Sequence, residues 1–296
     1  MKRVTSCMIL CAALLCNCRC LALDWKALHE QADRTDLRTA LMRVDKDPRS
    51  VPDLYLLGLV YLETYQPDKA GEVFGRLLSV DPQSVEGIWG KAEVMRRDHR
   101  YDQAEDLLVG IIEIDPDFCP AYLSLAYIRF AQARFEDSAN YALTVVRKNS
   151  RDVDTSTYAR AHLIYAGAKG MISYFGGPMS HFINGIIVMP TLREAQEMKP
   201  DSPEVLFGFG CYYLLAPRGM GKNIRLAQYY LERLVEDEPL FPDGFARLAQ
   251  VYKIQGDQKR YEQMLNTALE LDPRCELALD IKNGWCRFIC PEKKMR

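Results

Sequence analysis

Apolar and polar positions alternate with the period of an α-helix in a series of short, similar segments. Between about residue 35 and residue 273, stretches of about 13 residues carry apolar side chains at every third or fourth position. A proline, most often after an acid, follows the helical stretches at six places: Pro48, Pro82, Pro116, Pro200, Pro239 and Pro273. Three of the intervals between these prolines are 34 residues long. The pattern therefore predicts repeated pairs of helices, with no β-strand between Val51 and Pro273.

The repeated units also share a small residue at their eighth position. The residues found there are Gly58, Ala92, Ala126 and Ala249. A small side chain at this position allows the first helix of a pair to approach the second closely. Because no single pair buries its own apolar face, neighbouring pairs must stack on one another. We therefore expect an all-α protein built as a continuous stack of helix pairs.

This spacing resembles the tetratricopeptide repeat (TPR), a helix–turn–helix unit of about 34 residues. The resemblance implies a right-handed superhelix of antiparallel helix hairpins, a TPR-like α-solenoid with about six hairpins and a C-terminal capping helix. The predicted parts are an N-terminal helical pair at 23–50, three TPR units at 51–150, two TPR-like units with inserted loops at 151–241, a TPR unit at 242–274, and a capping helix with a tail at 275–296.

Two units depart from the regular length. The unit after Ser150 carries about 16 extra residues near 171–181, and the next unit carries about 5 extra residues at 215–223. Both insertions are expected to lengthen the turn between paired helices and to protrude from the same edge of the superhelix. They are either binding loops or simply longer turns. Their candidate binding residues are Phe175, Gly176, Gly177, His181, Arg218 and Lys222.

The resemblance also places the first helix of each unit on the concave side of the superhelix. The residues it assigns to this groove are Tyr55, Leu59, Trp89, Glu93, Arg96, Arg97, Tyr127, Phe130, Tyr212 and Tyr213. Aromatic and arginine side chains are enriched at binding hot spots. The adjacent Arg96 and Arg97 are suited to bind a carboxylate or phosphate with two hydrogen bonds. The alternative is that these aromatic residues pack against the next helix or against a returning C-terminal helix.

Residues 1–22 have the pattern of a signal peptide. Lys2 and Arg3 precede an apolar run of nine residues, Met8–Cys16, which is too short to span a bilayer. Small residues before Leu23 suit cleavage there, so we expect export to the periplasm or cell envelope. An alternative is a lipoprotein, acylated on Cys18, with this anchor as the contact with a membrane.

Cleavage would leave five cysteines: Cys119, Cys211, Cys275, Cys286 and Cys290. Five is an odd number, so at least one thiol is not paired within the chain. A bridge among the last three would hold the C-terminal helix in place. Their pairing is left open by the sequence.

Composition and motif searches exclude several classes of function. A hydrophobic content of 48% excludes a disordered chain, and 38 basic against 40 acidic residues disfavour nucleic acid as a partner. The sequence around Gly221-Lys222 lacks the other residues of a phosphate-binding loop, and the four histidines stand apart from one another. We therefore expect no enzymatic activity, no cofactor and no metal site.

These observations favour an exported, non-catalytic TPR scaffold or adaptor that binds a partner protein or peptide through its groove and inserted loops. The alternative is a transporter-accessory or small-ligand-binding protein with an apolar pocket near Tyr174, Tyr212 and Tyr213. Residues 203–273 look similar to the periplasmic TPR proteins associated with TRAP transporters, on the paired tyrosines, the loop at 216–222 and Ala227. That second resemblance implies an envelope or transporter component as partner, and a homo-oligomer.

Overall fold

The computed structural model describes residues 23–289, and these residues form helices with no strand among them. The signal peptide and Cys18 predicted above lie outside the described residues, as does Cys290. The helices are α1 (Trp25–Ala32), α2 (Leu37–Lys46), α3 (Val51–Glu63), α4 (Pro67–Val80), α5 (Val85–Arg97), α6 (Tyr101–Ile114), α7 (Cys119–Ala131), α8 (Phe135–Val146), α9 (Thr155–Phe175), α10 (Pro178–Met198), α11 (Pro203–Leu215), α12 (Ile224–Asp237), α13 (Pro242–Gln255), α14 (Gln258–Leu271) and α15 (Glu276–Asn283).

The Asp-Pro steps end helices as the sequence predicted. Asp81 ends α4 in an extended conformation, because a residue before proline avoids the helical region. Its carboxylate then accepts a hydrogen bond of 3.2 Å from the backbone N–H of Gln83. Ser84 caps the next helix by accepting a bond from the Gly87 N–H at 3.1 Å. The short sequence from Asp81 to Ser84 is therefore enough to reverse the chain between two helices.

Helices α3, α4 and α5 pack closely around Phe74 because glycines face its ring. The ring of Phe74 is fully buried between Gly58 of α3 and Gly90 of α5. A Cβ atom at either glycine would overlap this ring. Gly58 occupies the eighth position of its unit, so the small residue expected there has the expected role. Phe74 thus joins one helix pair to the next.

The first insertion does not form a loop, in contrast to the expectation from the sequence. Helices α9 and α10 each contain 21 residues and pack against one another as a long hairpin. The turn between them consists of Gly176 and Gly177, and Pro178 begins α10, where a proline needs no partner for its missing N–H. The extra residues therefore lengthen both helices. The second insertion is a loop at 216–223, between α11 and α12.

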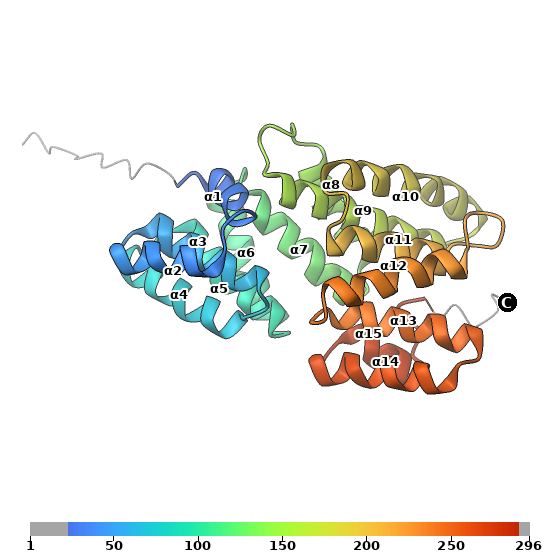
Figure 1. Cartoon of the computed structure of the whole chain (residues 1–296). Helices are drawn as coiled ribbons and strands as arrows, with labels where there is room; N and C mark the ends of the chain where they lie inside the picture. Colours follow the sequence, from blue (N-terminus) through green and yellow to red (C-terminus); the bar gives the residue numbers. More distant parts are fainter. Residues whose placement is uncertain (1–22, 290–296) are drawn as a thin grey trace, which may run out of the picture.

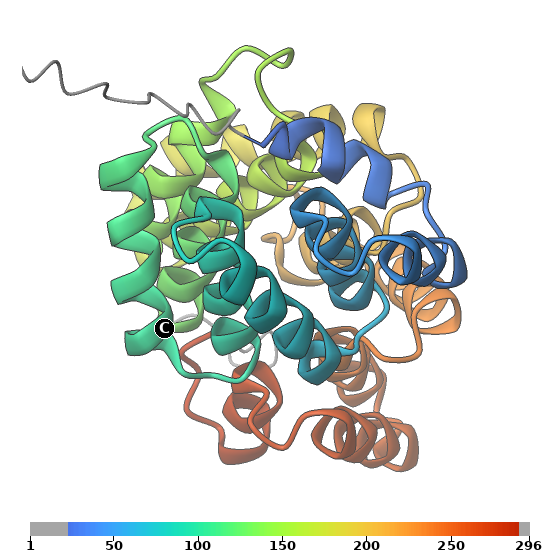
Figure 2. The same ribbon diagram turned by 90° about the vertical axis from the view of Figure 1, so that its left-hand side faces the viewer.

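The helices curve into an all-α superhelix whose distant parts touch. Helices α1 to α6 lie at the left of Figure 1 and α9 to α15 at the right, with α7 and α8 between them. Figure 2 shows the C-terminal helices, in red, below the repeats at the start of the chain. Helix α1 packs against both α3 and α9. None of the helices in the described part of the chain combines the length and apolar character needed to cross a bilayer.

Candidate functional site: an interior cavity

The concave side of the superhelix contains a cavity of about 780 Å³ that is partly open to solvent, which we call the interior cavity. Its wall is formed mainly by the first helices of the hairpins, α3, α5, α7, α9 and α11, together with α10, the start of α13 and residues 288–289. The placement of the first helices agrees with the concave side that the repeat pattern implied. Leucine and aromatic side chains alternate on this wall with charged side chains from the same helices.

The cavity collects most of the predicted groove residues. Its wall includes Leu59, Trp89, Glu93, Arg96, Arg97, Tyr127, Phe130 and Tyr212, together with His181 from the first insertion. Several of the predicted residues do not contribute to the wall: Tyr55, Tyr213, Phe175, Gly176, Gly177, Arg218 and Lys222. Whether the residues on the wall bind a partner stays a prediction.

Tyr55 and Tyr213 are absent from the wall because each packs against the chain itself. Tyr55 is fully buried, and its hydroxyl lies 2.8 Å from Nε2 of His29 in α1. This burial raises the pKa of Tyr55 well above its usual value. The Tyr213 ring stacks on Tyr230 of α12, with 5.8 Å between the ring centres. The expectation that both tyrosines face the groove is therefore wrong.

The predicted arginine cluster is already occupied by a carboxylate of the same helix. Glu93 accepts hydrogen bonds from Arg96 at 2.6 and 2.8 Å and from Arg97 at 3.1 Å. Ser124 of α7 donates to the same carboxylate at 2.9 Å. Burial raises the pKa of Glu93, but the two guanidinium groups outweigh burial and lower it to about 2. Arg96 and Arg97 thus share one carboxylate, which balances one of their two positive charges without a ligand. The spacing of Glu93 three and four residues before them could have revealed this pairing.

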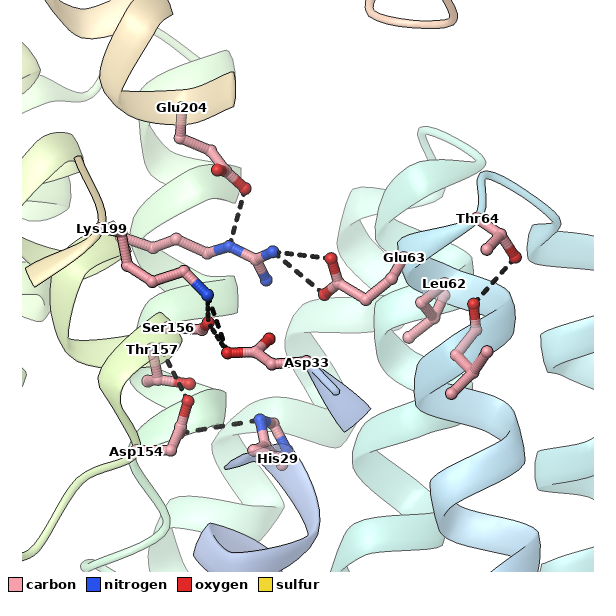
Figure 3. A network of polar contacts seen from close by, with 12 residues as sticks. His29, Asp33, Leu62, Glu63, Thr64, Asp154, Ser156, Thr157, Lys199 and Glu204 are labelled. Carbon is pink, nitrogen blue, oxygen red and sulfur yellow. Dashed lines mark hydrogen bonds and ion pairs between the residues drawn. The ribbon is translucent and has the colours of Figure 1, made fainter. Parts of the chain in front are cut away.

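A second ion network crosses the cavity and was missed by the sequence analysis. Arg160 of α9 donates to both carboxylate oxygens of Glu63 at 3.0 Å and to Glu204 of α11 at 2.8 Å. Burial raises the pKa of Glu204, but the Arg160 charge outweighs it and lowers this pKa. Figure 3 shows Lys199 beside Asp33 in the same region, with 2.8 Å between nitrogen and oxygen. These residues are far apart along the chain, so no local pattern marks them.

A cluster around His99, which we call the clasp, forms another part of the cavity wall. The His99 ring, at the turn between α5 and α6, lies 2.8 Å from Asp272 through Nε2 and 2.7 Å from Glu276 through Nδ1. Tyr101 donates its hydroxyl hydrogen to Glu276, and Asp98 pairs with Arg274. Both ring nitrogens face a carboxylate, so the doubly protonated ring satisfies both contacts. The clasp thereby joins the early repeats to the C-terminal cap.

The clasp predicts a pH-dependent stability. Hydrogen bonds to Asp272 and Glu276 raise the pKa of His99 to about 9, against 6.5 in the unfolded chain. Its stabilising contribution is therefore complete below pH 6.5 and lost as pH rises to about 9. We expect this loss to be about 1 to 2 kcal/mol, because the cluster is partly exposed to solvent. Urea unfolding of wild type and His99→Gln across this pH range measures it.

The matched control is His181→Gln, which removes a histidine that lies away from the clasp. We expect its difference from wild type to stay constant with pH, whereas the His99→Gln difference should shrink as pH rises. A constant difference for His99→Gln would show that the ring is neutral in the folded protein.

Comparison with known sequence families agrees with this architecture. Residues 61–128 and residues 242–275 each match a model of the tetratricopeptide repeat. The chain carries tetratricopeptide repeats. Comparison with curated proteins gave no significant match to the sequence.

Solved structures with TPR-like folds resemble this one over most of its length. They include the human IFIT1 dimer with m7Gppp-AAAA (TM-score 0.57, 19% identity, 80% of this chain and 54% of that chain). The APC/C hetero-tetramer Cut9-Hcn1 gives a TM-score of 0.54 at 16% identity, over 87% of this chain and 47% of that chain. A TPR protein from Parabacteroides merdae ATCC 43184 gives 0.52 at 14% identity, over 88% and 97%. The chain thus spans about half the length of the first two. Identities this low show a shared fold alone.

The C-terminal residues of the TPR superhelix turn back into the cavity. The predicted capping helix is α15, which has eight residues and ends at Gly284 in a left-handed conformation (φ 66°). Asp280, fully buried in α15, then accepts hydrogen bonds from the backbone N–H groups of Arg287 and Phe288 at 2.9 and 3.1 Å. Cys286 in this segment is disulfide-bonded, while Cys119, Cys211 and Cys275 are free thiols.

Phe288 and Ile289 occupy part of the concave surface. The Phe288 ring stacks on Phe130 of α7 with 6.1 Å between ring centres. The Ile289 carbonyl accepts long hydrogen bonds from Gln250 at 3.4 Å and Arg247 at 3.5 Å, both on α13. This contact is close to the alternative that the groove aromatics pack against a returning C-terminal helix, although the segment after α15 makes it and not the helix itself. The segment shows which groups of this surface receive an aromatic ring and a backbone carbonyl.

The described residues offer no arrangement suited to metal binding. Between residues 23 and 289, no group of three or more His, Cys, Asp or Glu side chains is placed to hold an ion. Glu63, Glu93, Glu204, Asp272 and Glu276 on the cavity wall pair with arginine or histidine side chains of the chain itself, and Asp243 accepts a hydrogen bond from the Cys275 thiol at 3.4 Å.

Proposed function

We propose that this protein is a non-catalytic scaffold that holds a short, extended segment of a partner protein in its interior cavity. The observation that carries this proposal is the seating of residues 288–289 against the first helices of the repeats. Apolar rings receive the Phe288 side chain, and side-chain donors on α13 receive the Ile289 carbonyl. About 780 Å³ next to this segment is open to an occupant.

The charges on the wall indicate which segment fits. Glu93 pairs with both Arg96 and Arg97, which leaves one positive charge, and Arg160 is shared between Glu63 and Glu204, which leaves one negative charge. Because these two groups together carry no net charge, a highly charged segment would lose hydration and gain little compensating attraction. An apolar segment with one or two aromatic side chains would contact the wall near Tyr127 and Phe207, and its backbone would bond to the polar groups between them.

The second candidate is a carrier of a small apolar ligand. The cavity volume falls in the range of about 300 to 1,000 Å³ that ligand pockets occupy. Tyr174 and Tyr212 both line the cavity, as this alternative required, whereas Tyr213 does not. Mass spectrometry of the purified protein under non-denaturing conditions separates the two candidates. A retained small molecule would increase the measured mass of the protein by an amount that matches no peptide.

Filling part of the cavity is expected to weaken segment binding. Gly170 lies on the cavity wall, and a Cβ there would meet its nearest neighbour, Val188, at an ordinary 3.8 Å. Gly170→Leu should therefore fold but occupy part of the cavity. For peptides selected from a random display library on wild type, we expect about tenfold weaker binding by fluorescence anisotropy.

The matched control is Gly75→Leu, which makes the same change at an exposed glycine of α4 with open space around it. It should bind the selected peptides as wild type does. Equal affinities of both variants and wild type would contradict the proposal that the interior cavity is the binding site.

We further propose that the chain is exported through residues 1–22, on the pattern described above, and that its partner lies in the cell envelope. The likeness to TRAP-associated TPR proteins makes a transporter subunit a reasonable first partner to test. Intact-mass measurement of the mature N-terminus decides between release after Ala22 and acylation at Cys18. An unprocessed N-terminal methionine in the mature protein would contradict export by this route.

A further inference from the structure

The tip of the α9–α10 hairpin exposes a row of apolar side chains, which we call the hairpin stripe. It consists of Met179, Phe182, Ile183 and Ile186, whose exposed fractions are 71%, 64%, 51% and 53%. Their spacing of three or four residues places them on one face of α10. A contiguous exposed apolar surface of this kind is typical of a site that binds another protein or a membrane.

The hairpin stripe is separate from the interior cavity. The side of α10 that lines the cavity carries His181, Gly185, Val188 and Leu192. The stripe residues alternate with these along the helix and do not belong to the wall. An occupant of the cavity would therefore leave the stripe uncovered, and the stripe needs an explanation of its own.

The stripe lies in a long uncharged part of the chain. Residues 170–192, which include the end of α9, the turn and most of α10, contain no Asp, Glu, Lys or Arg. An uncharged helical tip with satisfied backbone groups is inexpensive to remove from water. This composition fits an apolar environment better than a polar protein surface.

The loop at 216–223 lies beside the same hairpin, on the side of α10 that faces the cavity. Both the hairpin tip and this loop lie at the right-hand end of Figure 1. Met220 is 46% exposed, and its Cε lies 3.9 Å from the position of a Cβ on Gly185. The Tyr212 hydroxyl fixes the loop by donating to the Met220 carbonyl at 2.8 Å. The loop therefore places a further exposed apolar side chain beside α10.

Charges around this surface are basic. Arg193, Arg218 and Arg225 are exposed in the hairpin, the loop and the start of α12. No acidic residue occurs at 155–193 or at 205–231. Arg193 is followed on α10 by the exposed acids Glu194 and Glu197, so the basic character of this surface rests on Arg218 and Arg225. The surface thus combines an apolar centre with a cationic edge.

We propose that the hairpin stripe forms a docking surface for an anionic lipid bilayer. Apolar side chains on one face of a helix enter the boundary between headgroups and acyl chains, and nearby cations attract acidic lipids. A second copy of this chain is a poorer occupant, because two cationic edges would repel one another. The proposal concerns a surface outside the cavity, so it does not depend on the scaffold function.

Vesicle flotation tests the proposal on the full chain, with the same N-terminus in every variant. We expect wild type to bind phosphatidylglycerol-containing vesicles at least about fivefold better than phosphatidylcholine vesicles, since each cation near an acidic surface contributes about that factor. Phe182→Ser/Ile186→Ser should reduce binding about tenfold or more. The control Ile114→Ser/Leu240→Ser removes two exposed apolar residues elsewhere and should bind as wild type does.

A second measurement keeps the test valid if the double variant is unstable. Phe182→Trp places a fluorophore in the stripe, and its emission should shift to shorter wavelength with phosphatidylglycerol vesicles but not in buffer alone. Equal flotation of wild type and Phe182→Ser/Ile186→Ser would overturn the proposal. So would an emission wavelength of Phe182→Trp that does not change when phosphatidylglycerol vesicles are added. So would a wild-type dimer in sedimentation velocity that the same double variant dissociates, since the stripe would then be a self-association surface.

Discussion

Replacement of Phe74 by alanine is expected to lower the free energy of unfolding by about 3 to 5 kcal/mol. The ring is fully buried and fills the space that Gly58 and Gly90 leave between two successive helix pairs. Removing it leaves a cavity that the flanking helices close poorly, because their backbones are held by other contacts. Urea unfolding followed by circular dichroism measures the loss.

The adjacent residue provides the control for Phe74. Gly75 is exposed on the same helix with nothing near its Cβ position, so Gly75→Ala should stabilise the protein by about 0.5 to 1 kcal/mol. Gly58→Ala should destabilise wild type, but much less in a Phe74→Leu background, because the shorter side chain makes room. If Phe74→Ala cost under about 1 kcal/mol, the helix pairs would not depend on this contact.

Replacement of Glu93 by glutamine is expected to cost about 3 to 5 kcal/mol. The substitution keeps the shape of the side chain but removes the charge that balances Arg96 and Arg97. Both arginines lie on the cavity wall, with side chains 20% and 25% exposed, so water only partly replaces the carboxylate. The variant should also gain affinity for acidic peptides, because the arginine cluster becomes available.

The control for Glu93 is Glu113→Gln, which neutralises an exposed acid on α6 and should change stability by under about 0.5 kcal/mol. The low pKa of Glu93 gives an independent check. Its contribution is complete above pH 4.5 and should be lost as pH falls towards 2, so wild type and Glu93→Gln converge in acid. If Glu93→Gln were as stable as wild type at neutral pH, the ion cluster would not contribute to the fold.

The repeated fold could be predicted because its causes are local. An Asp-Pro step ends the helix before it, and a serine two residues after the proline caps the next helix, as at Pro82 and Ser84. The apolar period then determines which side of each helix is buried. Glu93 and Arg96 were both assigned to the concave side, and their pairing follows from a spacing along one helix.

Other features depend on contacts between distant residues and could not be predicted in this way. Arg160 meets Glu63 and Glu204 only because the superhelix curves, and His99 meets the C-terminal cap for the same reason. The first insertion was interpreted as a loop on its glycines and proline. Gly176 and Gly177 supply a single tight turn, and the uncharged residues on both sides extend helices instead. Tyr55 was predicted to face the groove, but α1 covers it, and no local pattern indicates that contact.

The central claim is that the interior cavity, and no outer face of the repeats, receives the partner segment. Photo-crosslinking tests it directly, with a photoreactive phenylalanine analogue in place of Tyr127 on the cavity wall or of Tyr229 on the outside of α12. A peptide selected on wild type should form an adduct through position 127 and not through position 229. Crosslinking from position 229 alone would contradict the claim and move the binding site to the outer surface.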